Sequence, residues 1–352
     1  MDKKIANPDM LLLARESRGI TQTDLAKRLH VSQAAISKAE KLPGKASEAL
    51  VADIAAELEY PESFFYQTGG RFATLSILHR KRATMPQKIR QRIEANANVT
   101  LLHIQHLSRL ADLPQNKVPR FSSEEFVNGI EGVAQAVRTI AHLPPGPLSS
   151  ITILLENLGV ILVARDFDSE KLDAFTMTNP DYHVIFFNQE MPWCRIRFSL
   201  AHELGHLVLG HIPGQDGIEE EANAFASALL MPKTEISQVF EGAKISLGYL
   251  ADLKPRWKVS MQALMRRAFD LNFLGQPSYE YLCRVMSIAG FKKQEPPMLN
   301  IPEETPGILR HMMTKHLYEL GYSKEELCEM LCVHPRTFDG LYPEFAKVTE
   351  IQ

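Results

Sequence analysis

The feature that most constrains this chain is an H-E-x-x-H motif inside an apolar stretch, residues 197–211 with the sequence RFSLAHELGHLVLGH. On a helix, His202 and His206 lie one turn apart on one face, so their imidazoles can take neighbouring corners of a tetrahedral zinc site. Glu203 would then reach a water molecule at the metal as a general base. Apolar residues surround the motif, and buried polar groups need partners. The motif is therefore a zinc site or a structural use of the same residues.

A third ligand is expected on the next predicted helix, GIEEEANAFASALLMP at 217–232. Ala222 and Ala226 mark the buried stripe of that helix, and Glu219 falls on the same face. A carboxylate on a buried stripe needs something to bind, which makes Glu219 the predicted third ligand. The alternative for the acidic first turn is a favourable interaction with the helix dipole.

The segments FSLAHELGHLVLGH and EEEANAFASALLMP together resemble the ImmA/IrrE family of metallopeptidases. The resemblance extends over about residues 124–290 and includes the upstream strand-like segments and the downstream LKPRWKVSMQALMRRA. It implies that a single zinc ion is bound by His202, His206 and Glu219, with Glu203 as the catalytic base. Manganese is not excluded, because a His₂Glu set suits several divalent ions.

The same family resembles gluzincins, in which an edge strand beside the active helix accepts the substrate backbone. YHVIFFN, residues 182–188, is expected to be that strand. The motif does not identify the residue that would stabilise the oxyanion. His211 and Tyr182 are the candidates, with a structural role as the alternative for each. His211 is not a metzincin-type ligand, because it stands nine residues after His202 instead of ten.

The first seventy residues contain TQTDLAKRLHVSQAAISKAEKL, which has the spacing of a helix-turn-helix. This segment resembles the XRE/Cro repressor family over about residues 9–66. The resemblance places the helix from 33 to 41 in the major groove of an operator, and helix-turn-helix geometry favours a homodimer. A helical protein-docking module is the alternative. The residues expected to contact DNA are Gln22, Ser32, Gln33, Ala34, Ser37 and Lys38.

Charge is unevenly distributed along the chain. The net charge is −3, yet residues 71–120 contain ten Lys and Arg against two Asp and Glu. Residues 1–70 contain nine Lys and Arg against ten Asp and Glu, and this lack of excess positive charge is unfavourable for binding DNA. We therefore expect dimerisation or the basic stretch at 80–92 to add affinity for phosphate.

The sequence near the C-terminus repeats the helix-turn-helix pattern. SKEELCEMLCVHPRTF, residues 323–338, aligns without gaps on residues 21–36. Its exposed positions do not include a set suited to reading bases. Packing or dimerisation is the expected role of this segment.

The fold class expected from these patterns is α+β, with a small sheet packed against helices. Four regions are predicted: a DNA-binding domain at 1–70, a basic helical connector at 71–120, a metallopeptidase domain at 121–290, and a helical C-terminal region at 291–352. A hydrophobic content of 45% with 23% charged residues is typical of a globular protein. The chain lacks a long apolar run or signal core, so a cytoplasmic protein without membrane contact is expected.

The predicted function is transcriptional control by a DNA-binding zinc endopeptidase that cleaves a repressor protein. Two alternatives remain open. In one, the metallopeptidase fold senses a metal, ligand or partner and cleaves nothing. In the other, the protein is a toxin–antitoxin component that binds its own operator.

Overall fold

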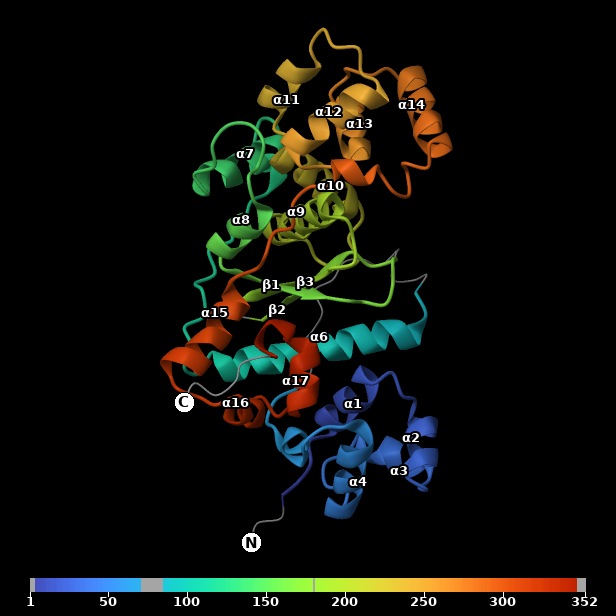
Figure 1. Cartoon of the computed structure of the whole chain (residues 1–352), viewed down its shortest axis with the longest axis vertical. Coiled ribbons are helices and arrows are strands. Elements are labelled where there is room, and N and C mark those ends of the chain that lie inside the picture. The colour runs from blue at the N-terminus through green and yellow to red at the C-terminus, as the bar shows by residue number, and fades with distance from the viewer. Residues whose placement is uncertain (1–3, 71–84, 180, 347–352) are drawn as a thin grey trace. The chain divides into compact units, whose positions relative to one another are not determined.

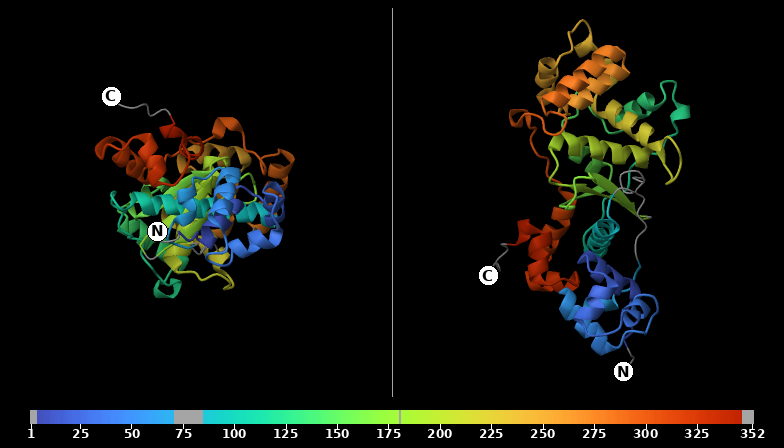
Figure 2. Two further views of the ribbon diagram at one scale, coloured as in Figure 1. Left: turned by 90° about the horizontal axis from the view of Figure 1, so that it is seen from below. Right: turned by 90° about the vertical axis from the view of Figure 1, so that its right-hand side faces the viewer.

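The computed structural model describes residues 4–70, 85–179 and 181–346. They form two compact units (Figures 1 and 2). The first unit contains the described residues up to 113 and those from 309 onward, and the second contains those from 114 to 308. The structure is helix-rich with one small sheet, so the predicted α+β class is confirmed. None of the described helices is long and apolar enough to span a membrane.

The first unit begins with five short helical segments around one apolar core. A side-chain oxygen at the residue before each of the four α-helices accepts a hydrogen bond from the first turn, which satisfies a backbone donor there. Met10, Ile36 and Phe65 are among the fully buried core residues. The segments are α1 (Pro8–Ser17), α2 (Gln22–Arg28), α3 (Gln33–Ala39), α4 (Glu48–Leu58) and η1 (Glu62–Tyr66).

The same unit contains a long helix and the C-terminal helices. His103 on the long helix shares a 2.8 Å hydrogen bond with Tyr342, which ties segments 239 residues apart in sequence. These elements are α6 (Gln87–Leu107), α15 (Ile308–Thr314), the π-helical η4 (Lys315–Glu319), α16 (Lys324–Met330), α17 (Pro335–Leu341) and η5 (Pro343–Phe345).

Helices α16 and α17 have the same local geometry as α2 and α3. Thr21 and Ser323 each cap the first helix of their pair by accepting a hydrogen bond three residues on. The turn contains a left-handed residue at the same position in both pairs, His30 with φ 53° and Cys332 with φ 52°. The C-terminal segment is thus a second helix-turn-helix in shape.

The second unit contains a three-stranded sheet: β1 (Val160–Arg165), β2 (Ala174–Thr178) and β3 (His183–Asn188). The strand order is β1-β3-β2, with β1 parallel and β2 antiparallel to β3. The expectation that YHVIFFN forms an edge strand is therefore wrong. All six residues of β3 are buried, and a strand apolar on both faces belongs in the middle of a sheet.

Glycine is required where the chain enters β1. Gly159 has φ +82°, and a Cβ built there would lie 2.1 Å from the backbone oxygen of Gln115. The Gln115–Lys117 backbone thus runs directly against the start of the sheet, and Lys117 donates a backbone hydrogen bond to the Leu158 carbonyl.

Helices cover the sheet of the second unit. Helix α9 (Trp193–Leu209) packs against both β2 and β3, and α10 (Ile218–Leu230) packs on α9. Figure 1 and the right-hand view of Figure 2 show α9 and α10 on one side of the sheet. The remaining helical elements are η2 (Ser123–Glu125), α7 (Ile130–Ile140), α8 (Ile151–Asn157), α11 (Lys233–Phe240), α12 (Leu247–Trp257), α13 (Met261–Asp270), α14 (Gln276–Ile288) and η3 (Pro297–Leu299).

Candidate metal centre and DNA-binding surface

Helix α9 carries the H-E-x-x-H motif within the core of the second unit. The helix begins after Pro192 and ends at Gly210, which adopts a left-handed conformation with φ 64° and caps the helix. His202, Glu203 and His206 are buried, with exposed fractions of 8%, 3% and 4%. Because α9 packs between the sheet and α10, these polar groups have little access to bulk water, and each needs a partner within the protein.

Close packing of α9 and α10 brings a third side chain to the two histidines. Gly205 makes this possible, because a Cβ there would lie 3.0 Å from Phe225 and 3.3 Å from the Cα of Ala222 on α10. Glu219, in the first turn of α10, places its carboxylate oxygens 3.5 Å from His202 Nε2 and 3.6 Å from His206 Nε2.

The three side chains form a cluster of a kind that holds a metal ion. One ligand atom from each of His202, His206 and Glu219 lies within 4.8 Å of the others. Burial lowers the pKa of His206 to about 2, and the neighbouring imidazoles of His202 and His211 lower it in the same direction. The imidazole is then neutral at physiological pH, which is the form that donates a lone pair to a metal.

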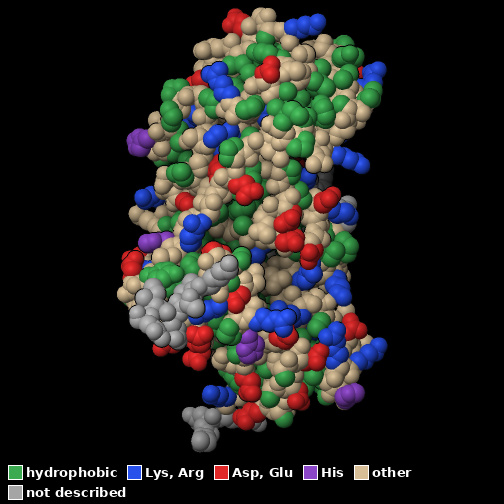
Figure 3. Space-filling view, viewed as in Figure 1, with side chains coloured by type: hydrophobic (Ala, Val, Ile, Leu, Met, Phe, Trp, Pro, Cys, Tyr) green, Lys and Arg blue, Asp and Glu red, His purple; other side chains and the backbone are tan. Residues whose placement is uncertain are grey.

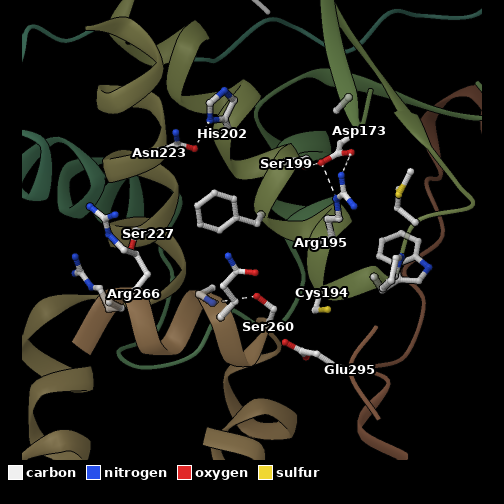
Figure 4. A pocket seen from close by; sticks show the side chains of 18 of the residues that line it. Asp173, Cys194, Arg195, Ser199, His202, Asn223, Ser227, Ser260, Arg266 and Glu295 are labelled. Carbon is white, nitrogen blue, oxygen red and sulfur yellow. Dashed lines mark hydrogen bonds and ion pairs between the residues drawn. The ribbon is translucent and has the colours of Figure 1, made fainter. Parts of the chain in front are cut away.

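Outer partners hold both histidines by their Nδ1 atoms. His202 Nδ1 is 3.0 Å from the side-chain oxygen of Asn223 (Figure 4). His206 Nδ1 is 2.8 Å from Nδ1 of His211, whose Nε2 is 3.0 Å from a carboxylate oxygen of Glu221. With Nδ1 engaged on both rings, the two Nε2 atoms turn inward and lie 3.0 Å apart.

Glu203 points to a different partner. Its Oε2 accepts a 2.6 Å hydrogen bond from the hydroxyl of Thr176 on the edge strand β2. The Thr176 residue is 2% exposed, so this bond is shielded from solvent. It fixes the direction of the Glu203 carboxylate relative to the sheet.

A cavity of about 1220 Å³ opens beside this cluster within the second unit. His202, Glu203 and Glu219 are among the residues that line it. Figure 4 shows His202 and Asn223 on one side, Arg195 with Asp173 and Ser199 on another, and Ser260 with Glu295 below them. The cavity is large enough for several residues of an extended peptide, since ligand pockets commonly measure 300–1,000 Å³.

The two candidates for stabilising an oxyanion lie elsewhere. His211 and Tyr182 are both buried, and neither lines the cavity. Burial raises the pKa of Tyr182 to about 12. Both ring nitrogens of His211 are in contact with other side chains, those of His206 and Glu221, so neither is directed into the cavity.

Sequence reasoning missed Thr176, Asn223 and the pairing of His211 with Glu221. Asn223 had a detectable signal, because it stands one helical turn after Glu219 and shares its face. Thr176 had none, because its contact with Glu203 depends on how β2 packs against α9.

The predicted DNA-contacting residues lie along one surface of the first unit. Gln22 and Ser37 are half-buried, and Ser32, which caps α3, is exposed, as are Gln33, Ala34 and Lys38. Figure 3 shows acidic and basic side chains interspersed over α1–α4.

A chain of hydrogen bonds orders part of this surface. Gln33 Nε2 donates to Gln22 Oε1 at 2.7 Å, and Gln22 Nε2 donates to Glu40 at 2.8 Å. Glu40 in turn accepts two hydrogen bonds from the buried Arg15, at 2.6 and 2.8 Å. Lys88 of α6 is exposed and lines the same shallow cavity, of about 420 Å³, as Gln22 and Gln33.

Two family models match the chain. Residues 155–269 match the IrrE N-terminal-like domain of a peptidase family, and residues 11–65 match a helix-turn-helix. Comparison with curated proteins finds no match. The chain therefore combines a region similar to XRE-type helix-turn-helix domains, at 11–65, with a region similar to the ImmA/IrrE-like peptidase family, at 155–269.

Proposed function

We propose that this protein is a DNA-binding transcription regulator whose second unit is a zinc-dependent endopeptidase. The observation that carries the proposal is the convergence of His202, His206 and Glu219 beside Glu203 at the wall of a large cavity. The peptidase domain is assigned to residues 121–290, between a basic connector at 71–120 and a helical region at 291–352.

The cluster fits a bound cation. Both Nε2 atoms face each other at 3.0 Å while their Nδ1 atoms are held by outer partners. One carboxylate oxygen of Glu219 is buried and has no hydrogen-bond partner. Two inward lone pairs and an unsatisfied carboxylate oxygen are costly without a positive charge between them. Two His and one Glu with a cavity beside them is the ligand set of a catalytic zinc site, and manganese is also compatible.

Glu203 is assigned the role of general base. A divalent ion in the cluster would supply Lewis acidity toward water and the peptide carbonyl. Glu203 takes the proton from the attacking water and passes it to the leaving amine. Thr176 holds one oxygen of the Glu203 carboxylate, which keeps the base oriented throughout the exchange.

Strand β2 is assigned as the site where the substrate backbone binds. In the described sheet β2 pairs only with β3, so its other edge has no strand partner there. Ala174 of this strand lines the cavity, close to where Thr176 meets Glu203. A peptide added as a further strand would pass the metal cluster, and the substrate proposed is a repressor protein.

The first unit is assigned to an operator. Helix α3 would enter the major groove, with Gln33 oriented by Gln22 toward a base edge and with Ala34 and Lys38 exposed beside it. Lys88 would add a phosphate contact that residues 1–70, with nine basic and ten acidic residues, lack. A homodimer would place two such surfaces on successive half-sites.

Metal content is the first test of the catalytic half of the proposal. The chain is expected to bind about one zinc ion, consistent with a single His₂Glu set, and His202→Ala is expected to lose it. A wild-type chain that binds no divalent metal after zinc is supplied contradicts the proposal.

Glu203→Gln tests the chemistry. This variant is expected to retain zinc but to cleave neither a peptide library nor a candidate repressor protein, because the amide cannot accept the proton. Cleavage that survives the substitution contradicts the mechanism. A zinc-bound wild type that cleaves nothing, with operator occupancy that follows zinc alone, identifies a non-proteolytic sensor. A cognate toxin gene beside the operator identifies a toxin–antitoxin component.

A further inference from the structure

The metal cluster has an outer support that differs for its two histidines. Asn223, from α10, holds His202. His206 is held by His211, which follows the end of α9, and His211 is held by Glu221. We infer that His211 and Glu221 form a positioning relay that fixes the tautomer and orientation of the ligand His206. This inference rests on the proposed metal centre.

If His211 is neutral, proton placement along the relay has one solution. A carboxylate only accepts hydrogen bonds, so the His211 nitrogen facing Glu221, Nε2, carries a hydrogen. In a neutral imidazole the other nitrogen is then an acceptor, so His211 Nδ1 accepts from His206. His206 must therefore carry its hydrogen on Nδ1 and present the bare Nε2 to the cluster. The charge of Glu221 thus selects the ligand form of His206.

The backbone holds the relay rigidly. The amide of His211 donates to the His206 carbonyl at 3.2 Å, and Gly210 between them closes α9. His211 is 7% exposed, and its ring meets that of His206 at a centroid distance of 5.1 Å and an angle of 69°. An edge-on approach of this kind directs one nitrogen at the other, as a hydrogen bond requires.

The relay also joins the two helices that supply the ligands. His206 comes from α9, whereas Glu221 stands two residues after the ligand Glu219 in the first turn of α10. Fixing His211 to both helices holds the loop between them, so the relay stabilises the spacing of the ligand set as well as the tautomer. Outer partners of this kind commonly contribute 10- to 100-fold to metal affinity.

The test is the zinc dissociation constant of the full chain, measured by competition with a chromogenic chelator. His211→Phe keeps a ring but removes both nitrogens, and it is expected to weaken zinc binding by about 10- to 100-fold. His211→Asn places an amide oxygen where Nδ1 was, since both atoms are bonded to Cγ. It is expected to restore binding to within about threefold of the wild type, because the acceptor for His206 is kept.

Glu221→Ala and Glu220→Ala form a matched pair, since both remove one negative charge from the same helical turn. Glu221→Ala is expected to weaken zinc binding less than His211→Phe does, because the Glu221 side chain is 45% exposed and water can replace it. Glu220→Ala is expected to leave the affinity unchanged. If His211→Phe fails to fold, this pair still tests the relay: equal zinc affinity in Glu221→Ala and Glu220→Ala overturns the inference.

A nitrogen-15 NMR spectrum of the metal-free chain tests the tautomer directly. His206 is expected to carry its hydrogen on Nδ1. A hydrogen on Nε2 overturns the inference, as does zinc affinity in His211→Phe equal to that of the wild type. Equal weakening in His211→Phe and His211→Asn also overturns it, because packing would then explain the effect. Failure of the proposed function is distinct, because it appears in the wild type as absent zinc or absent cleavage.

Discussion

Helix α9 of the metal centre and helix α3 of the DNA-binding surface both present polar side chains, but in opposite surroundings. On α9 the functional residues are at most 8% exposed and each has a defined partner. On and before α3 most of them are exposed, although Gln22 orders Gln33 and Ser32 caps the helix. A buried polar group without a partner costs about 1–3 kcal/mol, whereas an exposed one is satisfied by water. The candidate metal centre is therefore preorganised, whereas the exposed side chains of α3 are left to water.

The largest effect is expected for Glu219→Ala, which removes one of the three proposed metal ligands. Zinc affinity should fall by more than the roughly 100-fold that loss of an outer partner costs. Competition with a chelator measures it. DNA binding at low salt should not change, because Glu219 belongs to the second unit. A zinc affinity within threefold of wild type would show that Glu219 is not a metal ligand.

The next effect is expected at the contact that assembles the centre. Gly205→Ala should lower the free energy of unfolding of the second unit by about 1–3 kcal/mol, because its methyl group would push against Phe225 and the α10 backbone. Urea denaturation followed by tryptophan fluorescence reports on this unit alone, since Trp193 and Trp257 are the two tryptophans of the chain.

Gly248→Ala is the matched control, because a methyl group there meets only the Ser246 hydroxyl at 3.9 Å. Alanine favours helix over glycine, so this variant should be neutral or more stable by about 0.5–1 kcal/mol. Equal destabilisation of both variants would show that close packing at Gly205 is not special.

Gln33→Ala should act on DNA binding alone. Loss of a bidentate contact to adenine should weaken operator binding by about 1–3 kcal/mol and relax the preference at one base pair. Stability should change by less than about 0.5 kcal/mol, because the side chain is exposed. Fluorescence anisotropy on operator and mutated operator measures the effect. Arg336→Ala, exposed on α17 of the second helix-turn-helix, should have no effect.

The smallest effect is expected for Lys88→Ala. Removal of one phosphate contact should weaken binding to all DNA sequences alike and reduce the salt dependence of log K by about one unit. Anisotropy titrations at several salt concentrations measure the slope. Lys293→Ala, in the second unit, is the control. An unchanged salt dependence would show that Lys88 makes no phosphate contact, and dimerisation would then be the expected source of the additional DNA affinity.

The two helix-turn-helix segments show why the local fold is easier to predict than the binding partner. Leu25 and Ile36 in the first, and Leu327 and Phe338 in the second, are all at most 1% exposed. The turn residues His30 and Cys332 share the left-handed conformation. Buried positions and the turn specify the geometry, and these repeat in the sequence. The exposed residues, which would select a partner, do not repeat.

Much of the metal centre was also readable from the sequence. The placement of His202 and His206 on one face follows from helical periodicity. Glu219 was predicted because a carboxylate on a buried stripe needs a partner. The structure then places it beside both histidines.

The position of YHVIFFN was predicted wrongly, because strand order is not a local property. A run of buried residues is consistent with a central or an edge strand until the other strands are placed. Thr176 could not be found for the same reason, since it reaches Glu203 only through the packing of β2 on α9.

The α+β class, the helix-turn-helix segments and the residue types able to bind a metal follow from local sequence, since they depend on neighbours within one or two turns. Only the tertiary structure decided which strand lies at the edge, that Thr176 orients Glu203, and that His211 supports His206 instead of facing the cavity. Those contacts join residues whose distance in space is set by the packing of whole elements, and no local pattern encodes that distance.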